Sequence, residues 1–60
     1  MEKSIQIPRN SIEFDNVIKA YYKKYGKILQ IETMVYDNDL GKYYMQNSST
    51  DYTFTSKRIS

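Results

Sequence analysis

This 60-residue chain has no cysteine, histidine or tryptophan, three residue types that often stabilise small proteins or form their functional sites. Without cysteine no disulfide can cross-link the fold, and without cysteine or histidine the usual ligand sets for structural zinc are excluded. Domains typically contain about 50–250 residues, so we expect residues 1–60 to form one domain. A fold this small buries only about 60% of its unfolded surface, so it needs a well-packed core or a stabilising partner.

Groups that catalysis uses most often are also scarce. The chain lacks histidine, the most frequent general base, and cysteine, a frequent nucleophile. Its two glycines, Gly26 and Gly41, are too few for a glycine-rich phosphate-binding loop. The segment 37–41 has the composition of a calcium loop, but Ser48 stands where the bidentate glutamate is needed, so a turn is favoured. We therefore expect a protein that is not an enzyme and that binds no cofactor and no metal.

Long apolar runs are missing as well. No run approaches the ~20 residues of a membrane span, and the first residues lack the ~7–15-residue apolar region of a signal peptide. We expect a cytoplasmic protein that does not contact a membrane. Lysine, isoleucine, asparagine and tyrosine are frequent, which is typical of AT-rich genomes. Very short chains from such genomes are often encoded by phages or mobile elements, and this composition favours such an origin.

The strongest local pattern predicts an amphipathic helix at about residues 11–25. Apolar residues recur there at spacings of three and four, at Phe14, Val17, Ile18, Tyr21, Tyr22 and Tyr25. Asn10 followed three residues later by Glu13 resembles a capping box, with Asn10 as the N-cap. Gly26 follows the pattern at the place where a left-handed residue commonly ends a helix.

Alternation of polar and apolar residues predicts four strands, at 4–7, 28–36, 42–46 and 52 to about 58. Polar turns at 37–41 and 47–51 make the last three strands an antiparallel meander. Because the helix reverses the chain, we expect the first two strands to pair in parallel through a right-handed crossover. The predicted fold class is α+β, in the order β-α-β-β-β, with one amphipathic helix packed on one face of a mainly antiparallel sheet.

A period of two along 28–36 divides that strand into two faces. The set that we expect to face the helix is Leu29, Ile31, Thr33 and Val35. The set that we expect to be more exposed is Gln30, Glu32, Met34 and Tyr36. The predicted core between helix and sheet contains Val17, Ile18, Tyr21, Leu29 and Ile31.

Seven tyrosines in so short a chain are the second unusual feature. Tyrosine is enriched at protein interfaces, although cross-strand aromatic pairing within a sheet explains the same enrichment. One helix covers only one face of the sheet, so residues on the other face meet solvent or a partner. The partner-binding patch predicted on that open face comprises Met34 and Tyr36 together with Tyr43 or Tyr44. The favoured function is a small, non-catalytic protein-binding module that acts by occlusion, as an inhibitor or adaptor, and that forms a homodimer or a tight hetero-complex.

A second hypothesis comes from the basic and aromatic residues of segment 18–27. Its lysines, Lys19, Lys23, Lys24 and Lys27, are interleaved with tyrosines, a pattern that occurs in nucleic-acid-binding proteins. Lys57 and Arg58 are further candidates. Lysines near a helix end are also ordinary solvated surface, and the net charge of +2 is small for a nucleic-acid-binding protein. Nucleic-acid binding therefore stands as the alternative function.

Overall fold

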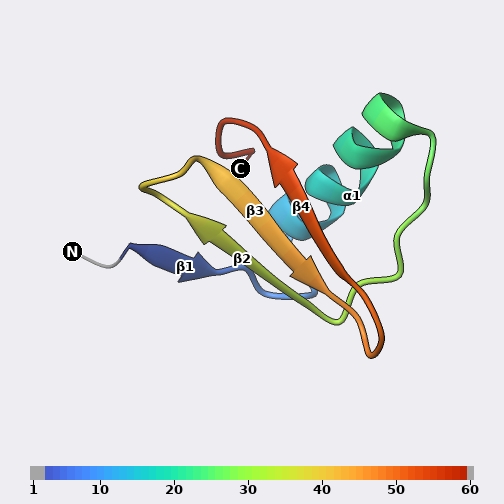
Figure 1. Ribbon diagram of the computed structural model, residues 1–60, viewed down its shortest axis with the longest axis horizontal. Coiled ribbons are helices and arrows are strands. Elements are labelled where there is room, and N and C mark those ends of the chain that lie inside the picture. The colour runs from blue at the N-terminus through green and yellow to red at the C-terminus, as the bar shows by residue number, and fades with distance from the viewer. Residues whose placement is uncertain (1–2, 60) are drawn as a thin grey trace.

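The computed structural model describes residues 3–59, and within them it contains one helix and four strands. The elements in chain order are β1 (Ser4–Gln6), α1 (Ile12–Tyr25), β2 (Thr33–Asp37), β3 (Lys42–Gln46) and β4 (Asp51–Thr55). The strands form one sheet in the order β1-β2-β3-β4, and α1 lies on one side of it (Figure 1). The predicted α+β class, with the order β-α-β-β-β and one helix on one face, is confirmed.

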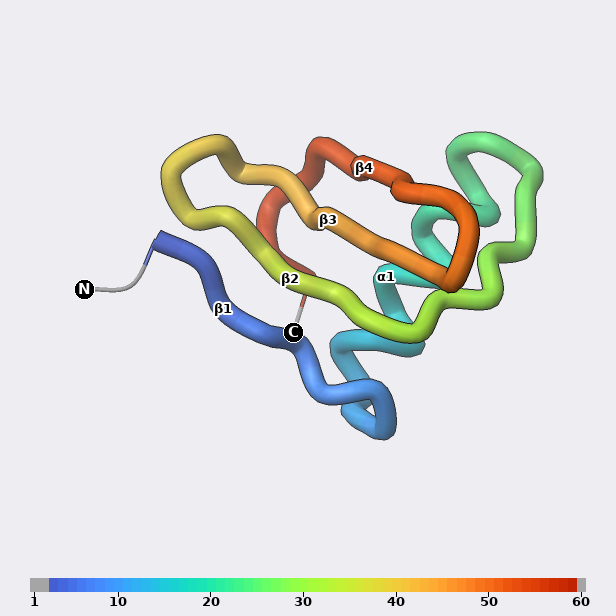
Figure 2. Tube along the Cα trace, turned by 60° about the horizontal axis from the view of Figure 1, so that its bottom comes forward, coloured from blue at the N-terminus to red at the C-terminus, as the bar shows by residue number. Residues whose placement is uncertain are grey.

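The pairing of the first two strands differs from the prediction. β1 runs antiparallel to β2, with Ile5 opposite Tyr36, so the expected parallel pair is wrong. The 14-residue helix advances the chain by about 21 Å, and the elongated segment 27–32 returns it by about 20 Å. The chain therefore comes back to the end of β1 before β2 begins (Figure 2). There the N–H of Ile7 donates to the carbonyl oxygen of Met34 at 2.9 Å.

Of the two caps predicted for α1, the one at its C-terminal end is confirmed and the one at its N-terminal end is not. The N-cap is Ser11, whose Oγ accepts from the N–H of Phe14 at 3.2 Å, so the prediction of Asn10 as N-cap is wrong by one residue. This shift moves Glu13 out of the position that a capping box requires. At the other end Gly26 has φ 71° and its N–H donates to the carbonyl oxygen of Tyr22 at 2.7 Å, which confirms the left-handed cap.

The two predicted hairpin turns are present at 37–41 and 47–51. Asp37 Oδ1 accepts from the N–H groups of Asp39 and Leu40 in the first turn, and Gly41 adopts φ 64°. In the second turn Asn47 Oδ1 accepts from the N–H of Thr50 at 2.7 Å. The last strand ends at Thr55 rather than near Arg58, because the chain then leaves the sheet edge and turns back toward α1 (Figure 1).

The face assignment of the second strand is reversed in the structure. Met34 is 0% exposed and Tyr36 is buried, whereas Thr33 is exposed. Leu29 and Ile31 are buried as predicted, but they belong to the irregular segment before the strand, which begins only at Thr33. Leu29 and Ile31 are two residues apart, but the next buried residue, Met34, follows after three, across the bend at residue 32. The alternation therefore does not continue from segment 27–32 into β2.

The core fills the space between α1 and the helix-facing side of the sheet. Its buried members are Ile7, Phe14, Val17, Tyr21, Leu29, Ile31, Met34, Tyr36, Tyr43, Met45 and Phe54. Four of the five predicted core residues are confirmed, and the fifth, Ile18, is only partly buried at the margin of the cluster. The rings of Tyr21 and Phe54, with centroids 5.8 Å apart in an edge-to-face arrangement, join the helix to β4.

Adjacent substitutions on β2 test which face of the strand is buried. We expect Met34→Ala to lower the free energy of unfolding by about 2–5 kcal/mol, because it leaves a cavity in the core. The matched variant Thr33→Ala should lower it by less than about 1 kcal/mol, because this side chain is exposed. Denaturant titration followed by circular dichroism measures both values. A larger loss for Thr33→Ala than for Met34→Ala would contradict the observed orientation.

Candidate functional site

The structure does not bring the four residues of the predicted partner-binding patch together. Tyr36 lies directly opposite Tyr43 on the helix-facing side of the sheet, and their ring centroids are 4.7 Å apart. Met34 and Tyr36 are buried, so their expected exposure is wrong, and of the two alternatives Tyr43 and Tyr44 the first is buried as well. Tyr44 alone lies on the open side, where it is 38% exposed and pairs with Val35.

The open side of the sheet is mainly polar. Neighbouring positions in one cross-strand row are Gln6, Val35, Tyr44 and Thr53, and the adjacent rows carry threonine, glutamine and charged residues. Alternation of buried apolar and exposed polar residues is typical of an antiparallel sheet with one solvated face. Among the described strand residues, this side therefore offers only Val35 and Tyr44 as apolar contact residues.

A partly buried polar cluster joins the first turn of α1, β3 and the segment after β4. Arg58 donates to Glu13 through two hydrogen bonds, Nε to Oε2 at 2.8 Å and Nη2 to Oε1 at 2.9 Å. The Tyr43 hydroxyl donates to Glu13 Oε2 at 3.0 Å and accepts from the N–H of Ile59. Among the described residues Glu13 is the one buried charged side chain. Sequence reasoning missed this cluster because its members are 30 and 45 residues apart.

The surroundings of the cluster fix its protonation. The hydrogen bonds from Arg58 lower the pKa of Glu13 below its usual value of 4.5 and outweigh the effect of burial, which raises it. Burial raises the pKa of Tyr43 to about 12. The carboxylate is thus ionised and the phenol protonated near neutral pH. Efficient proton transfer needs a pKa near the working pH, and the cluster is better suited to hold the fold together.

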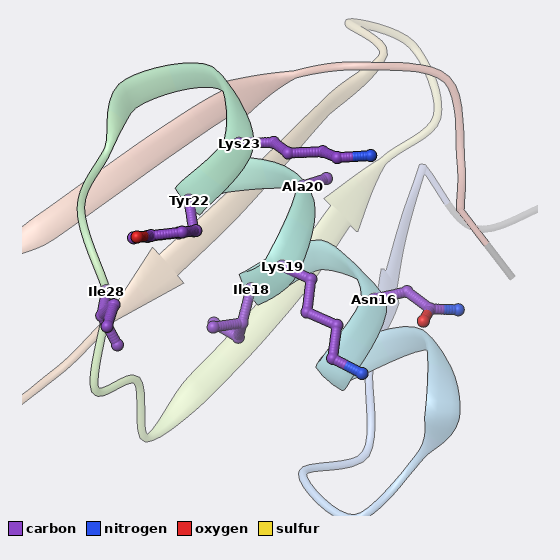
Figure 3. Close-up of a pocket in the computed structure, with 7 residues that line it drawn as sticks. All are labelled: Asn16, Ile18, Lys19, Ala20, Tyr22, Lys23 and Ile28. Carbon is purple, nitrogen blue, oxygen red and sulfur yellow. The ribbon is translucent and has the colours of Figure 1, made fainter.

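Exposed apolar residues gather on the outside of α1. We call this surface the α1 flank, and its lining residues are Asn16, Ile18, Lys19, Ala20, Tyr22, Lys23 and Ile28. Tyr22 is 51% and Ile28 76% exposed, and the partly buried Ile18 lies one helical turn from Tyr22. Figure 3 shows these three side chains on the same side of the helix, with Ile28 facing Tyr22 from the segment that follows. The aliphatic and aromatic surfaces therefore form one continuous apolar strip.

The four candidate nucleic-acid-binding lysines do not form a single stripe. Lys19 Nζ pairs with Asp15 Oδ2 at 2.9 Å, and Lys24 Nζ lies over the rings of Tyr25 and Phe54 at 5.4 and 5.6 Å. Lys19 and Lys23 are on the α1 flank, while Lys24 is turned toward β4. Lys27 follows the helix and is exposed. Arg58, a further candidate, is occupied by Glu13.

Other classes of site find no support in the part of the chain that the structure describes. Within residues 3–59 there is no group of three or more acidic side chains positioned to hold a metal ion. Nor does that part of the chain contain a helix with the length and apolar character needed to cross a membrane. Comparisons with protein-family models, with curated proteins and with solved structures find no match to this chain.

The Glu13 cluster makes stability depend on acid pH in a defined direction. Because the pKa of Glu13 is lower in the folded state, the unfolded chain binds this proton more tightly. The stabilisation is complete above the ordinary value of 4.5 and is lost as the pH falls through the folded pKa. Glu13→Gln should cost about 1–3 kcal/mol at neutral pH, nearer the lower figure because Arg58 is accessible to water.

Denaturant titrations of the natural chain and Glu13→Gln across acid and neutral pH measure this effect. The difference between the two free energies of unfolding should shrink as the solution is acidified. Asp15→Asn is the matched control, because its exposed pair with Lys19 is screened by solvent and should change stability by less than about 1 kcal/mol. A difference for Glu13→Gln that is independent of pH would contradict the assignment.

Proposed function

We propose that the protein is a small, non-catalytic protein-binding module that acts by occlusion, and that the α1 flank is its contact surface. The observation that carries the proposal is the apolar strip formed by the exposed Tyr22 and Ile28 with the partly buried Ile18. Single exposed apolar residues are common on soluble proteins, but a continuous group rimmed by polar residues is typical of an interaction site.

The composition of the flank favours a protein partner. A tyrosine between two isoleucines resembles the apolar centre of an interface, where stiff aromatic side chains contribute much of the binding energy. Lys19, Lys23 and Asn16 provide a polar rim. Lys23 gives this rim a positive charge, since Lys19 is paired with Asp15. Such a charge favours a partner surface that carries acidic residues, because complementary charges accelerate association and exclude wrong partners.

The helical part of this surface is held in place at both ends. Caps at Ser11 and Gly26 define both ends of α1, and Glu13 ties its first turn to the segment after β4. A surface that is already ordered loses little conformational entropy on binding. Binding alone then blocks whatever site the partner surface contains, which is the action that occlusion requires.

The size of the molecule sets the extent of the contact. A standard interface covers about 800 Å² on each partner, and the accessible surface of this protein is 4494 Å². One interface would thus cover roughly a fifth of the surface. The seven residues of the α1 flank are fewer than the roughly 20–30 that such an interface contains on each side, so we expect the contact to continue onto the exposed residues Lys27 and Gln30 beside Ile28.

Binding of nucleic acid is the second candidate, supported by Lys23, which lines the α1 flank together with Tyr22, and by the exposed Lys27. It is less well supported, because β-branched aliphatic side chains do not provide the flat stacking surface that single-stranded bases use. Two of the lysines also have partners within the protein, the Asp15 carboxylate and the aromatic rings beside Lys24.

Site-specific cross-linking tests the proposed contact surface. A photoreactive amino acid placed at Tyr22 in the native host should cross-link a discrete protein, because this side chain lies at the centre of the strip. The same amino acid at Thr33, exposed on the open side of the sheet, is the control and should not cross-link that protein. Cross-linking from Thr33 and not from Tyr22 would contradict the proposal.

The purified partner then permits a quantitative test. Tyr22→Ala should weaken its binding about thirtyfold or more, as truncation of an interface anchor costs about 2 kcal/mol or more. Tyr44→Ala removes an equally large aromatic side chain from the other side of the molecule and should change the dissociation constant less than about threefold. Calorimetry provides both constants, and circular dichroism verifies that each variant is folded. Equal losses for the two variants would place the contact elsewhere.

Titration of duplex and single-stranded DNA at two salt concentrations tests the second candidate. Binding through phosphate contacts must weaken steeply with salt, and the double charge reversal Lys23→Glu and Lys27→Glu should abolish it. We expect no saturable binding of either DNA at physiological salt. Saturable, salt-dependent binding that the double reversal removes would favour nucleic acid over a protein partner.

A further inference from the structure

The two edges of the sheet differ in how well they are protected from pairing. β1 is only three residues long and is flanked by Lys3 and Pro8, features that block addition of another strand. β4 contains five residues, alternates threonine with aromatic side chains, and has neither proline nor lysine within it. No strand among the described residues pairs with its outer side. The outer edge of β4 is thus the one available for strand addition.

The register between β3 and β4 identifies the groups that this edge presents. The N–H of Asn47 donates to the carbonyl oxygen of Thr50, and that of Ser56 donates to the carbonyl oxygen of Gly41. Hydrogen-bonded pairs alternate along an antiparallel ladder, so Tyr52 and Phe54 bond to β3. The N–H and C=O groups of the residues between them point away from the sheet; these residues are Asp51, Thr53 and Thr55.

We propose that β4 pairs with β4 of a second copy of this chain, antiparallel and centred on Thr53. This register pairs all five residues of the strand. Asp51 then stands opposite Thr55 of the second copy, Tyr52 opposite Phe54, and Thr53 opposite Thr53. The result is a symmetric contact of the kind found in two-fold dimers, which joins the two four-stranded sheets into one.

The side chains of β4 are complementary to themselves in this register. Its single charge, Asp51, meets a threonine rather than another carboxylate. The two Tyr52–Phe54 pairs are cross-strand aromatic pairs, which stabilise antiparallel sheets. A shift of two residues that centres the contact on Asp51 would place two like charges opposite each other. The sequence thus favours one register with a second copy.

Proline at the central position separates edge pairing from folding. Because the N–H of Thr53 points outward, Thr53→Pro removes a donor that the single copy does not use, and proline is tolerated at such edge positions. Thr53→Val keeps the N–H and is the matched control. Sedimentation velocity up to millimolar concentration should show a dimer for the natural chain and Thr53→Val, and a monomer for Thr53→Pro. A natural chain that remains monomeric, or a dimer that Thr53→Pro leaves intact, would overturn the proposal.

A cysteine at the same position gives a second test that does not depend on the proline variant folding. The chain has no cysteine, so a single Thr53→Cys substitution reports only on this contact. The Cα atoms of a hydrogen-bonded pair are about 5.5 Å apart, within the range that a disulfide spans. Mild oxidation should convert Thr53→Cys to a covalent dimer at least tenfold faster than Thr33→Cys, which is exposed on the same side of the sheet away from its edge. Equal rates would overturn the proposal.

Discussion

A single apolar layer between α1 and one side of the sheet forms the core of the described residues, and the chain has no cysteine to cross-link it. Every element contributes to this layer, from Ile7 after β1 to Phe54 on β4. Its largest fully buried side chains are Tyr43, Met34 and Met45. Methionine is flexible enough to fill irregular gaps, and tyrosine supplies large area together with a polar group that must be satisfied. The tyrosine hydroxyl in this apolar layer therefore needs a hydrogen-bond partner inside the protein.

The Glu13 cluster meets that requirement at the margin of the core. A buried ion pair is weak evidence for stability, because the loss of hydration of two charges offsets most of their attraction. The main contribution of this ion pair is to fix the relative positions of the elements that it joins. Glu13 accepts hydrogen bonds from both the Tyr43 hydroxyl and Arg58, and no buried side-chain polar atom of the described residues lacks a partner. The first turn of α1, the beginning of β3 and the segment after β4 are thereby fixed relative to one another.

Local rules predicted the elements of this fold but not how all of them face the core. The apolar spacing of 14–25 and the turn residues at 37–41 act within a few residues, so they predicted α1 and the first hairpin. The faces of Met34 and Tyr36 depend on a break in alternation at the bend before β2, and the apolar residues on both sides of this break conceal it. Ile28 was assigned to a strand for the same reason, which hid its place beside Tyr22. Contacts such as that of Glu13 with Arg58 arise only from the tertiary fold.

The α1 flank exists because the apolar arc of α1 is wider than the arc that packs against the core. Successive helical residues are rotated by about 100°, so Ile18 and Tyr22 lie well to one side of the core-facing Val17 and Tyr21. A helix that covers one sheet needs only the arc that contains Phe14, Val17 and Tyr21, and the apolar arc of α1 is wider than this. The apolar surface outside this arc continues beyond the helix to Ile28, whose side chain is exposed and does not take part in the core. Apolar surface that the fold neither buries nor needs is the feature that a partner would explain.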